Sequence, residues 1–178
     1  NVGKLVALRL SDTYKVNGIV RDAPTIEPFF EGRKDRIKLF EANLLDEMSN
    51  LRTIGSSSVR CPDSLVAPLR NANAIIICTG TTAFPTKAWT KSGEDQVSSS
   101  VLQALLDNSF SVPNAIASLD EQGLNTPNNV DAKSNDFIVN AWNDACRVEQ
   151  KRVIMLSSIG VQRRDAMPFP ILNACGVL

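Results

Sequence analysis

The sequence predicts an α/β protein built on a doubly wound parallel sheet, with helices on both faces. Short apolar runs rich in β-branched residues recur along the chain, and amphipathic helical patterns separate them. The run at 74–78 is apolar throughout, which is typical of a strand covered on both faces and therefore of a parallel sheet. In such folds, ligands bind at the carboxyl ends of the strands.

The chain begins with a predicted helix and strand. Apolar residues with helical spacing predict the helix from Val2 to Leu10, and the β-branched stretch at 16–20, which ends at Arg21, predicts a buried strand. Gly3 lies at the start of a helix that feeds a strand, as in the second half of a dinucleotide-binding βαβ unit. The first strand and two further glycines of such a unit do not precede it in this sequence.

The remaining elements continue this alternation. Helical spacing and apolar runs again separate helices from strands, and short polar stretches mark the turns. They are a short strand at 37–40, a turn at 43–46, a helix at 64–70, the strand at 74–78, a helix at 137–146 and a strand at 153–156.

One segment, residues 90–125, fits this alternation poorly. It is rich in Ser, Asn, Asp and Gly, and it is long for a connection in a compact domain, which predicts a lid or a docking element. Val101, Leu102, Leu105 and Leu106 predict one short amphipathic helix, with the serines at 98–100 as caps. Either this helix docks its apolar face onto a protein partner, or it folds back on its own domain.

Composition narrows the classes of function. With 178 residues, 43% of them hydrophobic, the chain can bury one core, and its 19 basic and 19 acidic residues leave no net charge to attract nucleic acid or anionic membranes. The absence of histidine excludes His bases and nearly all zinc-enzyme patterns, so no metal site is expected. The four widely spaced cysteines predict buried thiols in a reducing compartment, and no apolar run is long enough to span a membrane.

Five segments carry a family resemblance: "NVGKLV", "GIVRD", "ICTGTTAFPTKAW", "NTPNNVD" and "VIMLSSIGVQRRDAMPFPILNACGVL". Together they resemble the atypical short-chain dehydrogenase/reductase family, in particular its plastid-type NAD(P)-binding Rossmann proteins. The resemblance implies that residues 1–178 form part of one Rossmann domain, truncated at both ends, with 90–125 as an insertion. In that family a glycine-rich loop precedes the first helix, and Gly3 matches its third glycine. We therefore expect the protein to extend beyond both ends of this sequence.

The resemblance also implies a cofactor site along the strand ends. NADP is favoured over NAD because Arg21 can hold a ribose 2′-phosphate, where NAD-specific sites usually place a carboxylate. The alternative for Arg21 is a solvated residue at a strand end, and the absence of any bound cofactor is a further alternative. The implied contacts are Val2 and Gly3 near the pyrophosphate, Arg21 at the 2′-phosphate, Asn43 and Leu44 near the adenine, and Thr79, Gly80 and Thr81 near the ribose and nicotinamide.

Catalysis is less well supported than binding. Ser158, with Ser157 beside it, matches the serine that in active relatives lies beside a Tyr-x-x-x-Lys pair, but neither Tyr nor Lys follows it in this sequence. Phe137 stands where relatives carry Asn and cannot form that residue's hydrogen bonds. Two functions follow: an NADP-dependent oxidoreductase, or a non-catalytic scaffold, assembly factor or accessory subunit of a plastid photosynthetic complex. The expected location is the chloroplast, with the cytoplasm as the alternative.

Overall fold

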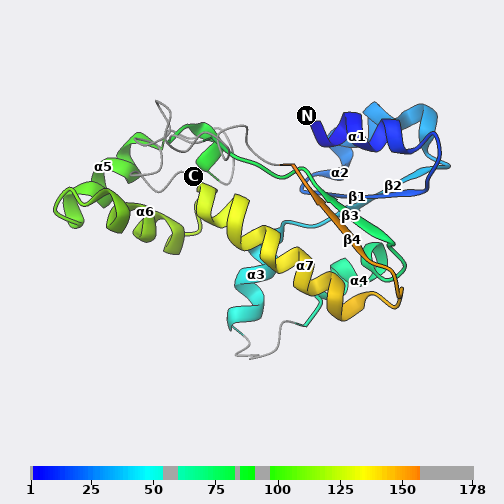
Figure 1. Ribbon diagram of the computed structural model, residues 1–178. Coiled ribbons are helices and arrows are strands. Elements are labelled where there is room, and N and C mark those ends of the chain that lie inside the picture. Colours follow the sequence, from blue (N-terminus) through cyan, green and yellow to red (C-terminus); the bar gives the residue numbers. More distant parts are fainter. Residues whose placement is uncertain (1, 54–59, 83–84, 91–96, 157–178) are drawn as a thin grey trace, which may run out of the picture. The chain divides into compact units, whose positions relative to one another are not determined.

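The structure is a computed structural model, and it describes residues 2–53, 60–82, 85–90 and 97–156. Its chain divides into two compact units. Unit 1 comprises Asn1–Cys78 and Ser134–Met155, and unit 2 comprises Thr79–Lys133 and Leu156–Leu178. The predicted insertion at 90–125 lies within unit 2. The elements of each unit can be followed by their labels in Figure 1.

Unit 1 begins with a helix and two parallel strands. Helix α1 (Val2–Leu10) and strand β1 (Val16–Val20) form where the sequence predicts them, and β1 pairs with β2 (Ile37–Glu41). The register sets Val16 opposite Ile37 and continues to the ends of both strands. The short helix α2 (Ala23–Ile26) and the 3-10 helix η1 (Glu27–Arg33) connect the two strands.

The rest of unit 1 supplies a second parallel pair. Strand β3 (Ala74–Ile77) pairs with β4 (Arg152–Met155), with Ala74 opposite Arg152. Between the two pairs along the chain come α3 (Leu44–Thr53) and α4 (Asp63–Leu69), and α7 (Ser134–Ala145) leads to β4. The predicted strands at 37–40, 74–78 and 153–156 are thus present, with ends displaced by one residue.

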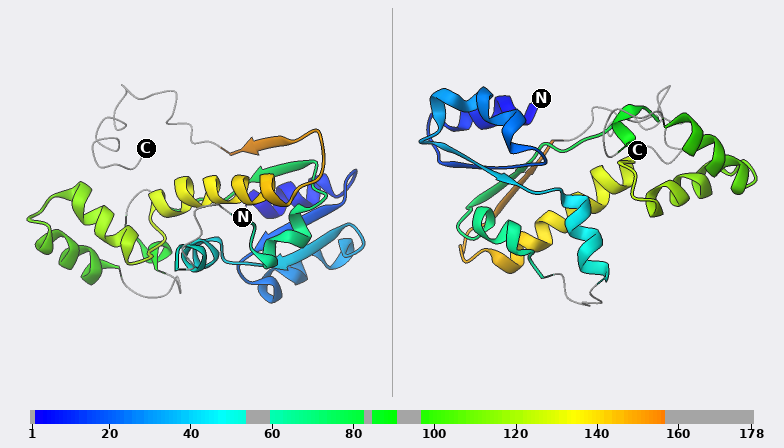
Figure 2. Two further views of the ribbon diagram at one scale, coloured as in Figure 1. Left: turned by 90° about the horizontal axis from the view of Figure 1, so that it is seen from below. Right: turned by 180° about the vertical axis from the view of Figure 1, so that it is seen from behind.

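The α/β class is confirmed in this form: helices with two parallel strand pairs, each a two-stranded sheet. All four strands run in the same overall direction in Figure 1 and in both views of Figure 2. Because hydrogen bonding alternates along a parallel strand, Asn17 and Ile19 of β1 direct their backbone groups away from β2. Within the described residues, that edge of β1 and the corresponding edge of β3 have no strand partner.

One apolar core holds unit 1 together. Helix α4 contacts β1, β2 and α7, and α3 also contacts α7. Trp142 is almost fully buried there, and its indole N–H donates to the carbonyl of Ala72 at 3.1 Å, which satisfies the one polar group of a large apolar side chain. The buried members of this core are Ala42, Cys61, Leu65, Leu69, Ile77, Phe137, Ile138, Ala141, Trp142, Ala145 and Cys146.

Unit 2 is helical in its described part. It contains the 3-10 helix η2 (Lys87–Trp89), the helices α5 (Ser98–Asp107) and α6 (Val112–Glu121), and the π-helix η3 (Asn128–Lys133). Helices α5 and α6 pack against each other as a hairpin. Their shared core is small, and its buried members are Trp89, Val97, Ala104, Ala115 and Leu119.

Two local predictions are wrong. The expected turn at 43–46 is the start of α3, because the Asn43 side chain accepts the Leu45 N–H at 3.3 Å and thereby begins a helix. The serines at 98–100 lie inside α5 and do not cap it. Val97 is buried in the unit 2 core, and its carbonyl accepts the Val101 N–H at 2.9 Å, so the first helical turn forms before the predicted start.

Candidate functional site

The start of α1 and the end of β3 form the best-defined part of the predicted cofactor site. Gly3 lies in the first turn of α1, and a Cβ built on it would be 3.3 Å from the Cβ of Cys78. That distance is tighter than nine in ten real Cβ contacts, so a side chain at this position would push the Cys78 side chain away by a few tenths of an ångström, and the close approach of helix to strand end favours a glycine. Val2, beside it, is exposed at the helix N-terminus, where backbone N–H groups and the helix dipole favour anions.

Arg21 lies directly after β1, at the carboxyl end of that strand, and its residue is exposed. Among the described residues it forms no ion pair. Its neighbour Asp22 does not neutralise it, because the Asp22 carboxylate caps α2 by accepting the N–H and the hydroxyl of Thr25 at 3.0 and 2.6 Å. These hydrogen bonds hold the pKa of Asp22 below its usual value.

Asn43 and Leu44 follow β2, and both contribute to the structure of unit 1. The Asn43 amide donates to the Asp46 carboxylate at 2.7 Å and also accepts from Leu45, so its side chain is occupied at the start of α3. Leu44 is half-buried and packs against the core. The structure places them at a strand end, as predicted, and a contact with adenine stays a prediction.

Thr79, Gly80 and Thr81 follow β3 in the chain and belong to unit 2. A Cβ on Gly80 would be 3.8 Å from a carboxylate oxygen of Asp131. The Asp131 carboxylate also accepts the backbone N–H of Thr81. Desolvation by the surrounding atoms raises the pKa of Asp131, although this N–H acts in the opposite direction. Among the described residues, the buried Thr81 hydroxyl has no hydrogen-bond partner.

The residues that the sequence ties to catalysis are Ser157, Ser158 and Phe137. Ser157 and Ser158 fall outside the described residues. Phe137 is buried in the core of unit 1, so this position contributes packing.

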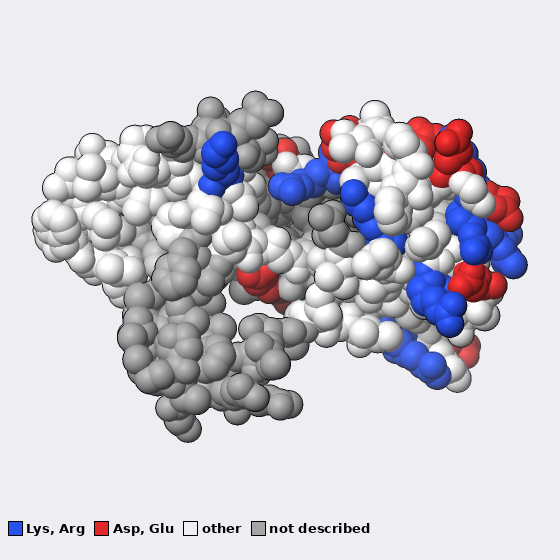
Figure 3. Space-filling view, turned by 90° about the horizontal axis from the view of Figure 1, so that it is seen from above, with Lys and Arg blue, Asp and Glu red and all other residues white. Residues whose placement is uncertain are grey.

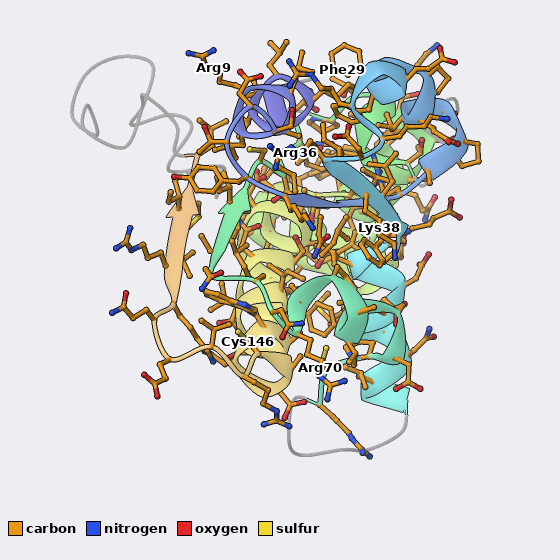
Figure 4. All side chains as sticks on the ribbon, turned by 90° about the vertical axis from the view of Figure 1, so that its right-hand side faces the viewer. Arg9, Phe29, Arg36, Lys38, Arg70 and Cys146 are labelled. Atoms are coloured by element: carbon orange, nitrogen blue, oxygen red, sulfur yellow. The ribbon has the colours of Figure 1, made fainter. Side chains whose placement is uncertain are left out.

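A pocket that the sequence analysis missed lies at the opposite ends of β1 and β2. It has a volume of about 260 Å³, and Figure 4 shows the labelled Arg36 and Lys38 on this side of unit 1. Lys34 is already paired with Glu27 at 2.9 Å. The alternation of basic residues at 34, 36 and 38 is the signal that could have indicated it. The lining residues are Lys15, Val16, Asn17, Lys34, Asp35, Arg36, Ile37 and Lys38.

The structure thus brings the start of α1 to the end of β3, and it places Arg21, Asn43 and Thr79 within two residues of the ends of successive strands. In the described part of the chain, no group of three or more Cys, Asp or Glu could hold a metal ion. Each helix described there is too short or too polar to cross a membrane. No family model, curated protein or solved structure matches the chain.

Proposed function

We propose that the chain binds a dinucleotide at the carboxyl ends of the strands of unit 1, with NADP preferred over NAD. The observation that carries this proposal is the close approach of Gly3 to Cys78. A glycine that lets the first turn of a helix approach a neighbouring strand end is one of the requirements of a dinucleotide-binding loop. The same helix N-terminus offers unpaired backbone N–H groups to a pyrophosphate.

The strand pairs support the finer fold that this proposal needs. Helix α1 contacts β1 and, through Gly3, the end of β3, so it links the two pairs. One further parallel strand between β1 and β3 would use both unpaired edges and join the pairs into a single doubly wound sheet of the Rossmann type. Unpaired backbone groups in a protein interior cost about 1–3 kcal/mol each, which favours such a strand.

Arg21 supports the preference for NADP. It is exposed, has no acidic partner among the described residues, and follows the strand whose end contacts the ribose in such folds. A guanidinium can donate two parallel hydrogen bonds to a phosphate. It cannot accept the proton of a ribose hydroxyl, as the carboxylate of an NAD-specific site does.

Titration of the full chain with NADPH and NADH, followed by nicotinamide fluorescence, tests the proposal. We expect NADPH to bind at least about tenfold more tightly, and Arg21→Ala to remove most of that difference while NADH affinity is kept. Arg36→Ala is the matched control, because Arg36 is an exposed arginine at the amino end of β2. Failure of both nucleotides to bind, or equal losses for both in Arg21→Ala, contradicts the proposal.

A second pair of variants tests the packing at Gly3. Gly3→Val would push against Cys78 and displace the first turn of α1, and we expect nucleotide affinity to fall about tenfold or more. Gly32→Val is the control, because a Cβ on Gly32 meets no atom within 4 Å. If both variants bind nucleotide like the parent chain, the start of α1 is not part of the site.

A second candidate function is that of a non-catalytic accessory subunit of a plastid complex. Exposed apolar side chains on the α5–α6 hairpin favour it, as does the burial of Phe137 in the core. The test is the size of the native assembly that contains the chain. Replacement of exposed hairpin leucines by Gln should release the folded chain from that assembly, and an unchanged assembly contradicts the role.

A further inference from the structure

The hairpin of α5 and α6 carries apolar side chains that its own unit does not bury. Leu102, Leu106 and Phe110 are 56%, 51% and 67% exposed, and Val112, at the start of α6, is also exposed. Leu102 and Leu106 lie four residues apart and therefore on one face of α5. These four residues are called the hairpin surface below.

The hairpin surface is distinct from the face with which α5 packs in unit 2. Ala104 is buried in the unit 2 core, and Val101 and Leu105 pack against it, so one side of α5 is fully used within the unit. The sequence left open whether this helix docks on a partner or folds back on its own domain. Val101 and Leu105 fold back on their own unit, and Leu102 and Leu106 do not. Helix α5 therefore has two apolar faces. A helix that packs against its own unit on one side requires only one.

The turn between the two helices is strained in a way that exposes Phe110. Ser109 and Phe110 have φ angles of 52° and 60°, in the left-handed region that favours Gly and Asn. A backbone hydrogen bond from the Phe110 N–H to the Leu105 carbonyl, 2.7 Å long, holds this conformation. A bulky aromatic residue kept in an unfavourable conformation, with its ring in solvent, indicates selection for something other than stability.

Charge around the hairpin surface indicates the chemistry of its partner. From Ser92 to Ala132 the sequence has no Lys or Arg, and every charged residue there is acidic. Asp107 directly follows Leu106 and is exposed. In Figure 3 the face of unit 2 is mostly uncharged, whereas Lys, Arg, Asp and Glu crowd the face of unit 1. An apolar surface with an exposed aspartate beside it, on a segment without Lys or Arg, matches a partner whose apolar face is flanked by basic residues, and it disfavours anionic lipids.

We infer that the hairpin surface binds an amphipathic helix of another protein, whose apolar face is flanked by Lys or Arg. Leu102, Leu106 and Phe110 would form the apolar contact. Proteins recognise an amphipathic helix through regularly spaced apolar side chains of this kind. Asp107 would pair with a basic flank and select against acidic ones. This inference rests on the second candidate function and does not depend on dinucleotide binding.

The experiment uses the full chain and two synthetic helical peptides with one Leu-rich amphipathic sequence, flanked in one by Lys and in the other by Glu. Fluorescence anisotropy of labelled peptides gives the affinities. We expect the Lys-flanked peptide to bind at least about tenfold more tightly, and Leu102→Gln and Leu106→Gln each to weaken it about tenfold. Leu5→Gln, at a leucine of unit 1 that is 61% exposed, is the matched control and should change nothing.

Two further variants separate docking from a structural role. Asp107→Lys should abolish or reverse the preference for the Lys-flanked peptide. Phe110→Asn should leave the unfolding midpoint unchanged or raise it, because Asn tolerates the left-handed conformation, and it should weaken peptide binding. A lower midpoint with unchanged peptide affinity overturns the assignment of Phe110.

Several results would overturn the inference as a whole. Equal affinities for the two peptides exclude the charge preference, and full affinity in Leu102→Gln and Leu106→Gln excludes the surface. Self-association in sedimentation that Leu106→Gln abolishes assigns the surface to a second copy, and binding to phosphatidylserine vesicles assigns it to a membrane. If the native assembly still depends on the hairpin while the peptides fail to discriminate, the accessory role stands and this partner chemistry is wrong.

Discussion

Unit 1 and unit 2 are stabilised in different ways. In unit 1, parallel strand pairs and amphipathic helices bury one apolar core, and backbone hydrogen bonds hold the strands of each pair in register. In unit 2, the described residues form helices around a smaller core, and side-chain amides hold the connections. Asn125 donates to the carbonyls of Ala88 and Thr90, and Asn129 donates to those of Asp120 and Leu124. The comparison shows that polar side chains can replace strand pairing where apolar area is limited.

The two tryptophans test whether this difference extends to stability, since each core contains one of them. Trp142→Ala should destabilise unit 1 by about 3–5 kcal/mol, through the lost apolar contacts and the cavity. Urea unfolding is followed by circular dichroism and by the fluorescence of Trp89, which then reports unit 2 alone. An equal shift of the Trp89 transition would show that the two units unfold as one.

A charged hub in unit 2 gives the next largest effect. Asp120, whose side chain is 6% exposed, accepts from the Thr126 hydroxyl, the Asn128 amide and the Lys133 ammonium. Asp120→Ala should cost about 3 kcal/mol, because it removes the acceptor of the buried Thr126 hydroxyl and the carboxylate that pairs with Lys133.

The readout for this variant is Trp89 fluorescence in a Trp142→Phe background. Asp107→Ala serves as control. Its carboxylate accepts from Gln103 on the exposed side of α5, and its loss should cost less than about 0.5 kcal/mol. Similar losses in the two variants would mean that Asp120 is not a hub.

The thiol of Cys61 makes unit 1 sensitive to alkaline pH. Burial, followed by the nearby carboxylates of Asp144, Asp63 and Glu47, raises its pKa from 9.0 to about 11. The protonated thiol is therefore favoured in the folded state, and its contribution is complete below pH 9 and lost as the pH rises toward 11. The loss is on the order of 2 kcal/mol.

Urea midpoints between pH 8 and 11, read from Trp142 fluorescence, measure this loss. Cys61→Ala should flatten the decline in unit 1, and the Trp89 transition of unit 2 should not respond to the substitution. A decline that is the same with and without the thiol would assign it to other groups.

The smallest expected effect concerns the link between β1 and α4. The Asn17 amide donates to the Pro68 carbonyl at 2.9 Å, which fixes the strand against the helix. Asn17→Ala should lower the stability of unit 1 by about 1 kcal/mol. Asn114→Ala, at an exposed position in α6, should leave thermal unfolding unchanged. If Asn17→Ala also has no effect, packing alone positions this strand.

Hydrophobic periodicity predicts unit 1 well, and the reason is physical. Leu5 and Leu10 of α1, the run at 74–77 and the stripe from Phe137 to Ala145 each follow the period of the element that they form. In α3, by contrast, Leu44, Met48 and Leu51 carry the helical spacing, but the polar residues at 43 and 46 suggested a turn. A local turn signal and a cap signal use the same residue types, so that boundary could not be read from the sequence.

Unit 2 was harder to predict because its order depends on contacts between distant residues. The burial of Val97 decides where α5 begins, and the carbonyls that Asn125 bonds lie more than thirty positions earlier in the chain. Helix α6 was not expected at all. Among the candidate site residues, the predicted strand ends gave the correct positions of Arg21 and Asn43. They did not indicate that the Asn43 side chain is hydrogen-bonded to Leu45 and Asp46 at the start of a helix.

The absence of Lys and Arg from the α5–α6 hairpin has a practical consequence. Trypsin cuts after Lys and Arg, and between Lys91 and Lys133 it meets no such residue. Digestion therefore releases both helices, with their connecting turn, as one continuous peptide. Mass spectrometry of chemically cross-linked assemblies can follow that single product, so whatever covers the hairpin would be recovered attached to it.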